Sequence, residues 1–434
     1  MRRAYKIAKL YVVAIFLTVA TLPALAYERA TIAQLEQMLA AAHGKSDKAL
    51  AKRLGELELT ERLSTLRLEK LQASLPGDKS RQALLVLSDN SVFHDLPAAE
   101  IPHLAAPDSD TQSKILSKTT DYIRQALPRQ IDIVVSRNTA RFDNLKVVSS
   151  DHTLPAETQQ AKTMTEAEQG AQFFPAVALA VVEDRPFRLT GKTSETVTYR
   201  NGAEVVVYRD GAKVTDAPAN APKRPPPSGI SNWGVFGPLL EVVVNDISAA
   251  KTDWGHWEQG RKGTLAVFRY DVPQDQSNYD VQSCCFTGGV GWNVYETLTA
   301  YHGEIAVDPE TGAILRLTIQ TDILADQPIY RADILAEYGP VELGGKEYIF
   351  PTRSVTISGA PVPVMVQEQN CADFHCTPSE YVHPKDTVVS DTVYNSYHVF
   401  RAETRILPTD ASAPAGDSPS SSQPQNRAPR KQEP

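Results

Sequence analysis

The sequence has few of the features that mark nucleic-acid-binding proteins or well-known enzyme classes. Its 52 Asp and Glu residues outnumber 44 Lys and Arg residues, which gives a net charge of −8. An acidic chain gives no electrostatic support for nucleic-acid binding. The patterns G-x-x-x-x-G-K-[ST], G-x-S-x-G, H-E-x-x-H and S-x-x-K with its partner motifs are missing too. We therefore assign no catalytic and no metal-binding residue, and we expect no cofactor.

Long apolar runs are also scarce, and the one that matters lies at the start of the chain. Basic residues precede the run 10–22, and Ala24-Leu25-Ala26 follows it as a small-x-small cleavage site. This pattern predicts a secretory signal peptide over 1–26. The run is shorter than the roughly 20 residues that span a bilayer, so an uncleaved anchor is the less favoured alternative. We expect a periplasmic or extracellular protein with no stable transmembrane anchor after cleavage.

Cysteine is rare, and its four copies form two close pairs. Cys371 and Cys376 flank a short loop, whereas Cys284 and Cys285 are adjacent. In an oxidising compartment an even count favours disulfides, and four cysteines allow three pairings. A Cys371–Cys376 bridge is our first choice, and cross-pairing stays open. A redox or metal site that also uses His375 is the alternative, although its spacing matches no zinc pattern.

The first part of the mature chain has a helical pattern. Thr31 and Gln34 form a capping box before an apolar stripe that ends at Gly44. Similar short amphipathic segments follow, so we predict a small helical bundle over 27–97. The Pro- and Ala-rich residues 98–112 are predicted to be a linker, and a further helix is predicted from about Gln112 to Ala126.

After this helix the period changes to that of β-strands, and we predict a sheet domain with overall bounds 113–407. Asn201-Gly202 and Gly344-Gly345 are typical two-residue hairpin turns. The segment 301–322 predicts two strands joined by a turn at Asp308–Gly312. From Pro408 the chain is rich in Pro, Ser, Ala and Gln, and the tail 408–434 is predicted to be disordered.

One segment of this region has a helical pattern. Its apolar residues recur at i, i+3, i+4, i+7, i+8 and i+11, which predicts a helix at about 234–249; they are Phe236, Leu239, Leu240, Val243, Val244 and Ile247. Laying this helix on the apolar side of the sheet would bury both. The predicted fold is therefore α+β: a helical bundle followed by a curved antiparallel sheet, or half-barrel, packed on an amphipathic helix.

Candidate binding residues come from this helix and from the sequence DWGHWEQG at 253–260. Strict alternation would place Trp254, His256 and Glu258 on one side of a strand, with Trp257 on the other. The candidate ligand-binding residues are Phe236, Leu240, Val243, Trp254 and Trp257. A hydrolase site near Trp254–Glu258 is an alternative, and aromatic packing is another. His302-Gly303-Glu304 resembles half of a zinc deaminase signature, but the P-C-x-x-C half is missing.

The order of these segments over about 118–407 resembles a group of exported bacterial proteins that have no established activity. It includes LPRQIDIVVSRNTARF, GHWEQGRKGTLAVFRYDVP and ILAEYGPVELGGKEYIFP. The strand–helix–strand layout also resembles, by pattern, the LolA-like half-barrel of periplasmic lipoprotein carriers. That resemblance implies a sheet curved around helices, with a concave side that accepts acyl chains.

The function hypothesis that follows is a non-enzymatic binding or carrier protein of the cell envelope. Its ligand would be a lipid, an acylated chain or a segment of an envelope protein. A protein-interaction scaffold that uses the helical region is an alternative, and the hydrolase is a further one.

Overall fold

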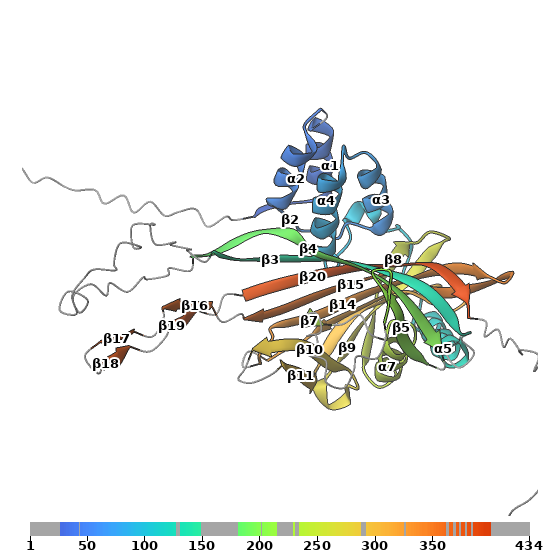
Figure 1. Ribbon diagram of the computed structural model, residues 1–434. Helices are drawn as coiled ribbons and strands as arrows, with labels where there is room; N and C mark the ends of the chain where they lie inside the picture. The colour runs from blue at the N-terminus through green and yellow to red at the C-terminus, as the bar shows by residue number, and fades with distance from the viewer. Residues whose placement is uncertain are drawn as a thin grey trace, which may run out of the picture. The chain divides into compact units, whose positions relative to one another are not determined.

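The computed structural model is dominated by one large sheet (Figure 1). The chain divides into two compact units, Met1–Phe400 and Arg401–Pro434. The structure describes residues 27–42, 44–126, 131–148, 181–200, 202–214, 229–230, 234–287, 292–324, 327–361, 364–367, 370–372, 375–377, 380–382 and 385–400. The predicted signal peptide and the predicted disordered tail lie outside these residues and stay predictions.

Eleven antiparallel strands form this sheet, in the order β6-β5-β4-β3-β20-β15-β14-β13-β12-β9-β8. The sheet does not close, and β6 and β8 are its edges. The predicted α+β class with a large antiparallel sheet is therefore confirmed. The strands are β3 (Ile133–Val148), β4 (Val181–Arg200), β5 (Ala203–Arg209), β6 (Ala212–Lys213), β8 (Lys251–Gln259), β9 (Thr264–Val272), β12 (Tyr301–Val307), β13 (Ile314–Thr321), β14 (Arg331–Leu343), β15 (Lys346–Pro361) and β20 (Lys385–Val399).

Glycines at the hairpin turns adopt the left-handed backbone conformations that these turns require. Gly344 and Gly345, at φ of 60° and 77°, join β14 to β15 with Leu343 opposite Lys346. A two-residue turn needs these left-handed conformations, which only glycine adopts without strain. In the β12–β13 turn Gly312 has a φ of 79° and its N–H donates to the Asp308 carbonyl. These turns lie where the sequence predicts them.

Shorter strands form smaller sheets. A three-stranded sheet contains β7 (Gly229–Ile230), β10 (Asp280–Thr287) and β11 (Trp292–Leu298). Two-stranded sheets pair β16 (Val364–Gln367) with β19 (Glu380–Val382), and β17 (Asn370–Ala372) with β18 (His375–Thr377). A parallel pair joins β1 (Glu28–Ala30) to β2 (Leu57–Leu59).

Four α-helices occupy the N-terminal part: α1 (Ile32–Ala41), α2 (Asp47–Gly55), α3 (Thr65–Ala73) and α4 (Asp78–Asn90). The predicted capping box is present, since the Thr31 hydroxyl accepts from the Gln34 N–H and the Gln34 side chain accepts from the Thr31 N–H. Leu35, Leu54 and Leu84 are buried in a shared apolar cluster. That 27–97 forms an independent bundle stays a prediction.

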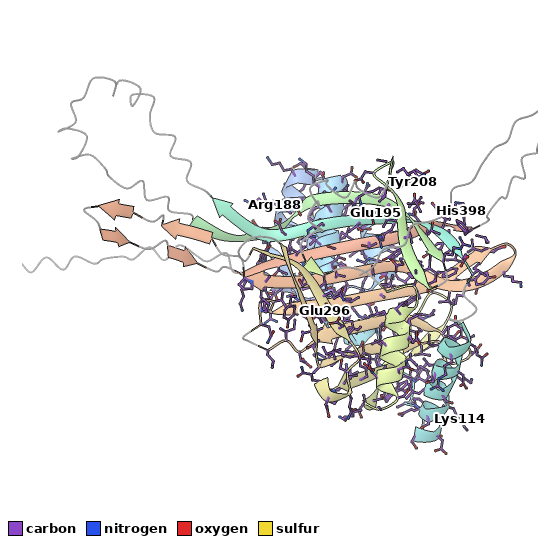
Figure 2. All side chains as sticks on the ribbon, turned by 60° about the horizontal axis from the view of Figure 1, so that its bottom comes forward. Lys114, Arg188, Glu195, Tyr208, Glu296 and His398 are labelled. Atoms are coloured by element: carbon purple, nitrogen blue, oxygen red, sulfur yellow. The ribbon has the colours of Figure 1, made fainter. Side chains whose placement is uncertain are left out.

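Neighbouring residues of each central strand point to opposite faces of the large sheet. Leu335 and Val355 pack with Val86 of α4, and we call this side the α4 face. The next residue of β14, Ala336, belongs to a separate core with Val243 and Leu239, and we call that side the α7 face (Figure 1). Side chains cover both faces, and Glu195 of β4 and Tyr208 of β5 lie near the β6 edge (Figure 2).

Two helices belong to the core of the α7 face. Helix α7 spans Pro238–Ile247, within the predicted 234–249, with proline in its first turn. Val243 is fully buried, and burying one such side chain contributes about 1.5–3 kcal/mol. Helix α5 (Ser109–Ala126) contributes Ile115 and Ile123, and it starts three residues before the predicted Gln112. No helix within the described ranges is long and apolar enough to cross a membrane.

Candidate functional site

Strand β8 sorts the residues of DWGHWEQG onto the two faces of the sheet. The register with β9 shifts between Trp254 and His256, so Gly255 forms a β-bulge. Trp254 and Trp257 consequently share the α7 face, where they pack edge-on at 4.9 Å. His256 and Glu258 point to the α4 face. The prediction that Trp254 shares a side with His256 and Glu258 is wrong, because a bulge adds one residue and reverses the alternation.

On the α4 face, Glu258 lies between two buried arginines. Its Oε2 accepts 2.7 Å hydrogen bonds from Nη2 of Arg62, just before α3, and from Nη2 of Arg316 on β13. Arg316 Nη2 also donates to Glu304 Oε2 on β12 at 3.1 Å. His256 Nε2 is 3.8 Å from the same Glu258 oxygen. The two arginines and two glutamates of this network connect the N-terminal segment with β8, β12 and β13.

The arginines hold both carboxyl groups in the ionised form. Burial alone raises the pKa of Glu258, but the charges of Arg316 and Arg62 outweigh it and bring the pKa well below 4.5. The same balance lowers the pKa of Glu304. Such weak bases accept protons poorly at neutral pH. The arrangement favours a structural role for Glu258.

A second buried cluster surrounds Arg353 of β15. Its Nε donates to Asp391 Oδ1 of β20 at 3.3 Å, and its Nη2 donates to Asp89 of α4. Glu337 Oε2 of β14 lies 3.9 Å from Arg353 Nη1, and Glu337 Oε1 accepts from the Thr65 hydroxyl at 2.6 Å. One guanidinium therefore faces three carboxyl groups.

Asp89 is the most deeply buried of these three carboxyl groups, and its surroundings favour the neutral form. Its burial and the nearby charge of Asp391 raise the pKa of Asp89 well above 3.8, although Arg353 opposes the shift. Asp89 is fully buried, and its Oδ2 has no hydrogen-bond partner. Even without Asp89, the two carboxyl groups of Glu337 and Asp391 outnumber the one guanidinium of the cluster.

A cavity of about 1120 Å³ lies beside both clusters. Its charged lining on the α4 face includes Arg62, Glu258, Arg316, Glu337, Arg353 and Asp391. Its apolar lining includes Tyr338 and Phe350 of the sheet core. On the α7 face it also includes Ile123 of α5, Leu240 of α7 and Phe236 just before α7. Side chains from both faces thus border one space, which we call the cavity.

The cavity reaches both faces because β13 and β14 separate. Their pairing ends where Arg316 meets Glu337, while β14 continues to Leu343 paired only with β15. The cavity is bordered by 313–315 on one side of this gap and by 338–340 on the other. The pairing of β14 with β15 has a bulge at the same point, between Glu337 and Tyr338, where Thr352 of β15 is the extra residue. Bulges commonly redirect side chains next to binding sites.

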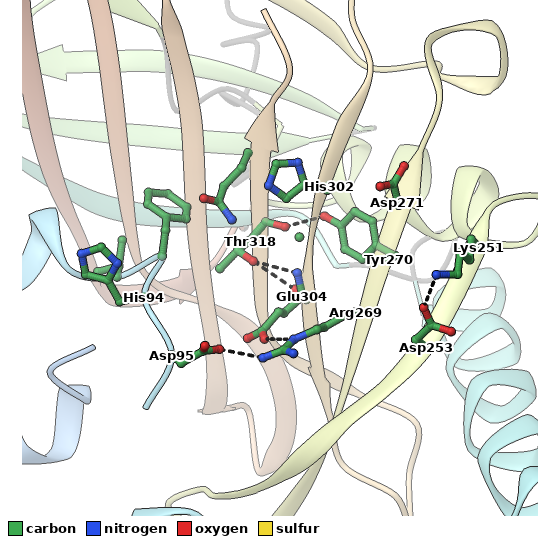
Figure 3. A pocket seen from close by; sticks show the side chains of 14 residues that line it. His94, Asp95, Lys251, Asp253, Arg269, Tyr270, Asp271, His302, Glu304 and Thr318 are labelled. Atoms are coloured by element: carbon green, nitrogen blue, oxygen red, sulfur yellow. Dashed lines mark hydrogen bonds and ion pairs between the residues drawn. The ribbon is translucent and has the colours of Figure 1, made fainter. Parts of the chain in front are cut away.

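A smaller, polar pocket of about 380 Å³ lies on the α4 face near β9 and β12 (Figure 3). Arg269 Nη2 is 2.6 Å from Asp95 Oδ1, and Arg269 Nε donates to Glu304 Oε1 at 3.2 Å. His94 and His302 also line it. Glu304 links this pocket to the cavity through Arg316. The lining of this smaller pocket is mostly polar, whereas the larger cavity combines charged and apolar side chains, so we regard the larger cavity as the stronger candidate site.

The five candidate ligand-binding residues have different environments. Phe236 and Leu240 line the cavity. Val243 is fully buried in the core. Trp254 packs against Phe268, and Trp257 Nε1 donates to the Ala105 carbonyl at 2.9 Å. None of these last three is among the residues that line the two described pockets. Their role in ligand binding stays a prediction.

The cysteine predictions concern side chains outside the described part of the structure. The backbone of β17 pairs with β18 so that Cys371 is opposite Cys376. Cys284 and Cys285 lie in β10, next to a register shift. The disulfide assignments stay predictions. Within the described residues, no group of three or more His, Cys, Asp or Glu side chains has the geometry of a metal site.

Reasoning from the sequence missed the arginines of the site. Arg62 and Glu258 are 196 residues apart, and Asp89 and Arg353 are 264 apart. The alternation of β13 places Arg316 on the face opposite to Leu317, but alternation alone does not identify a partner for its charge. The one usable signal is a charge within an otherwise apolar strand, as in ILRLTI, because such a charge needs a partner when buried.

Comparison of the chain with known protein families, curated proteins and solved structures finds no match. The two resemblances described above therefore stay predictions, and the function has to be argued from the cavity and its lining.

Proposed function

We propose that this protein is a non-enzymatic binding or carrier module of the cell envelope, which holds an elongated and largely apolar ligand in the cavity. In this proposal the open sheet acts as a half-barrel curved around α7. The ligand is a lipid, an acylated chain or an apolar segment of an envelope protein. The observation that carries the proposal is one cavity that joins a charged lining to an apolar, aromatic lining.

The size and chemistry of the cavity support this proposal. Ligand pockets usually measure about 300–1,000 Å³ and are mostly apolar with a few polar groups that fix orientation. The cavity, at about 1120 Å³, is slightly larger than the upper limit of that range. Its apolar end contains Phe236, Leu240 and Phe350, whereas its polar end contains the buried ion pairs. An amphiphile fits such a division better than a uniformly polar substrate does.

The hydrolase alternative has one supporting observation, the position of Glu258 at the cavity with His256 nearby. A general base needs a pKa near the working pH. The pKa of Glu258 is instead lowered by two arginines, which also occupy one of its oxygens. The binding function is therefore the better supported of the two.

The scaffold alternative uses the N-terminal helices as a docking surface. One side of α4 already packs on the sheet through Val86, and Asp89 is bonded to Arg353. The helices therefore cover one face of the sheet. The binding proposal needs this cover, whereas a docking scaffold would not require it.

Native mass spectrometry of the protein purified from its own envelope tests the proposal. We expect an apolar molecule to be retained by the full chain and lost from Ala126→Trp, which adds bulk to the cavity lining. Ser117→Trp, at an exposed position of the same helix, is the control and should retain the molecule. Purified protein free of any apolar ligand, with no uptake from lipid extract, would overturn the proposal.

A further inference from the structure

The charge of the cavity lining is not evenly balanced. Its cationic side chains are Arg62, Arg261, Lys262, Arg316 and Arg353, and its carboxylates are Glu69, Glu258, Asp308, Glu337, Glu347 and Asp391. Most of these form local pairs. Arg261 pairs with Glu69, and Lys262 Nζ lies 2.7 Å from Glu347. Asp308 is occupied within its own turn, where it accepts from the Glu310 N–H and the Thr311 hydroxyl.

The Arg353 cluster also has more carboxyl groups than cations, and Glu337 is its most accessible carboxylate. The Glu337 side chain is 19% exposed, whereas those of Asp391 and Asp89 are 3% and 0% exposed. Its contact with Arg353 is long at 3.9 Å, and its remaining short bond comes from the neutral Thr65 hydroxyl. A poorly compensated carboxylate in a sheltered site attracts a cation.

Apolar surface adjoins Glu337 inside the cavity. Leu335 lies two residues away on the same strand and face, and Tyr338 follows Glu337 across the bulge. Tyr348 and Phe350 stack at 5.7 Å between ring centroids and also line the cavity. Aromatic faces attract cations in addition to supplying apolar contact. The surface therefore offers an anionic group next to a path for an alkyl chain.

We infer that the cavity takes a single-chain amphiphile with a cationic, ammonium-type head group. The head group lies against Glu337, and the alkyl chain extends past Tyr338 and Phe350 towards Phe236 and Leu240. This inference rests on the proposed function and specifies the chemical class of its ligand. Charge complementarity selects a cation over an anionic or an uncharged head group.

Titration calorimetry of the full chain with three ligands of equal chain length tests this inference. The ligands are dodecyltrimethylammonium, dodecanoate and dodecanol, each used below its aggregation limit. We expect the cation to bind about tenfold or more tightly than the other two, because its quaternary nitrogen is attracted by the Glu337 carboxylate and by the aromatic rings. In Glu337→Gln this preference should disappear, because the charge that selects the cation is removed. Glu342→Gln, exposed on the same strand and outside the cavity, should keep the preference.

The outcomes separate the two proposals. Equal affinity for all three ligands, or an unchanged preference in Glu337→Gln, would overturn the inference and leave the binding function supported. No binding of any of the three, in protein that unfolds cooperatively, would count against both. Loss of all binding in Ala126→Trp locates the ligand in the cavity.

Discussion

At the residue scale, the α4 face contains buried charged side chains that are stable only when an oppositely charged partner is present. Arg316 and Arg353 are almost fully buried, and each contacts at least two carboxyl groups. A buried pair adds little net stability compared with apolar residues, but removing one partner leaves an uncompensated charge. These residues should therefore be sensitive to isosteric neutral substitutions.

Glu258→Gln should destabilise the protein strongly. It removes the acceptor charge shared by Arg62 and Arg316, which are both buried, and we expect a loss of about 3–5 kcal/mol in the free energy of unfolding. Urea unfolding measures this loss. Glu347→Gln breaks an exposed pair and should change the free energy by less than about 1 kcal/mol. Equal effects of the two substitutions would contradict the role given to Glu258.

Asp89 should make stability fall as pH rises. Its folded-state pKa is raised above 3.8 by burial, so the folded protein keeps a proton that the unfolded chain releases near that pH. Its contribution is complete below pH 3.8 and is lost as pH rises through the folded pKa. Unfolding free energies measured from about pH 4 upward should show this slope in the wild type.

Asp89→Asn should remove that slope, because the amide does not titrate and still accepts from Arg353. Asp78→Asn, exposed in the first turn of the same helix, serves as the control and should keep it. A slope that persists in Asp89→Asn would assign the titration to another group.

At the scale of single elements, the sequence correctly predicted those features that depend on residues close together in the chain. The period of α7 and the glycines of the β14–β15 turn are readable because each depends on adjacent residues. The two faces of β8 were mispredicted, since the bulge at Gly255 depends on pairing with β9. A Cβ on Gly255 would lie 3.0 Å from the Val267 carbonyl oxygen, so a larger residue here would require a small shift of β9.

Strand β12 offers a sharper test of close packing. A Cβ on Gly303 would lie 2.0 Å from the Thr318 carbonyl oxygen of β13 and 2.8 Å from the Tyr270 hydroxyl. Gly303→Ala should therefore cost at least about 1–3 kcal/mol, because backbone must move. Gly191→Ala, on β4, meets nothing within 4 Å and should be close to neutral. Thermal unfolding of both variants measures the difference, and a neutral Gly303→Ala would contradict the described packing.

At the scale of the whole molecule, the sequence predicted an open antiparallel sheet with a helix on its apolar face, but not where a ligand binds. The cavity is built from α3, α5, α7 and strands distant in sequence, and it exists because β13 and β14 separate beyond Arg316. No local period specifies such a gap. Phe236 and Leu240 were predicted from the stripe of α7, whereas Arg62, Glu337 and Arg353 depend on tertiary pairing.

The most direct test is a crystal structure of the full chain purified with its endogenous ligand. We expect electron density for one elongated molecule between residues 313–315 and 338–340, in contact with Phe236 and Leu240. Strands β13 and β14 paired beyond Arg316, with side chains filling the space between them, would contradict the proposed binding function.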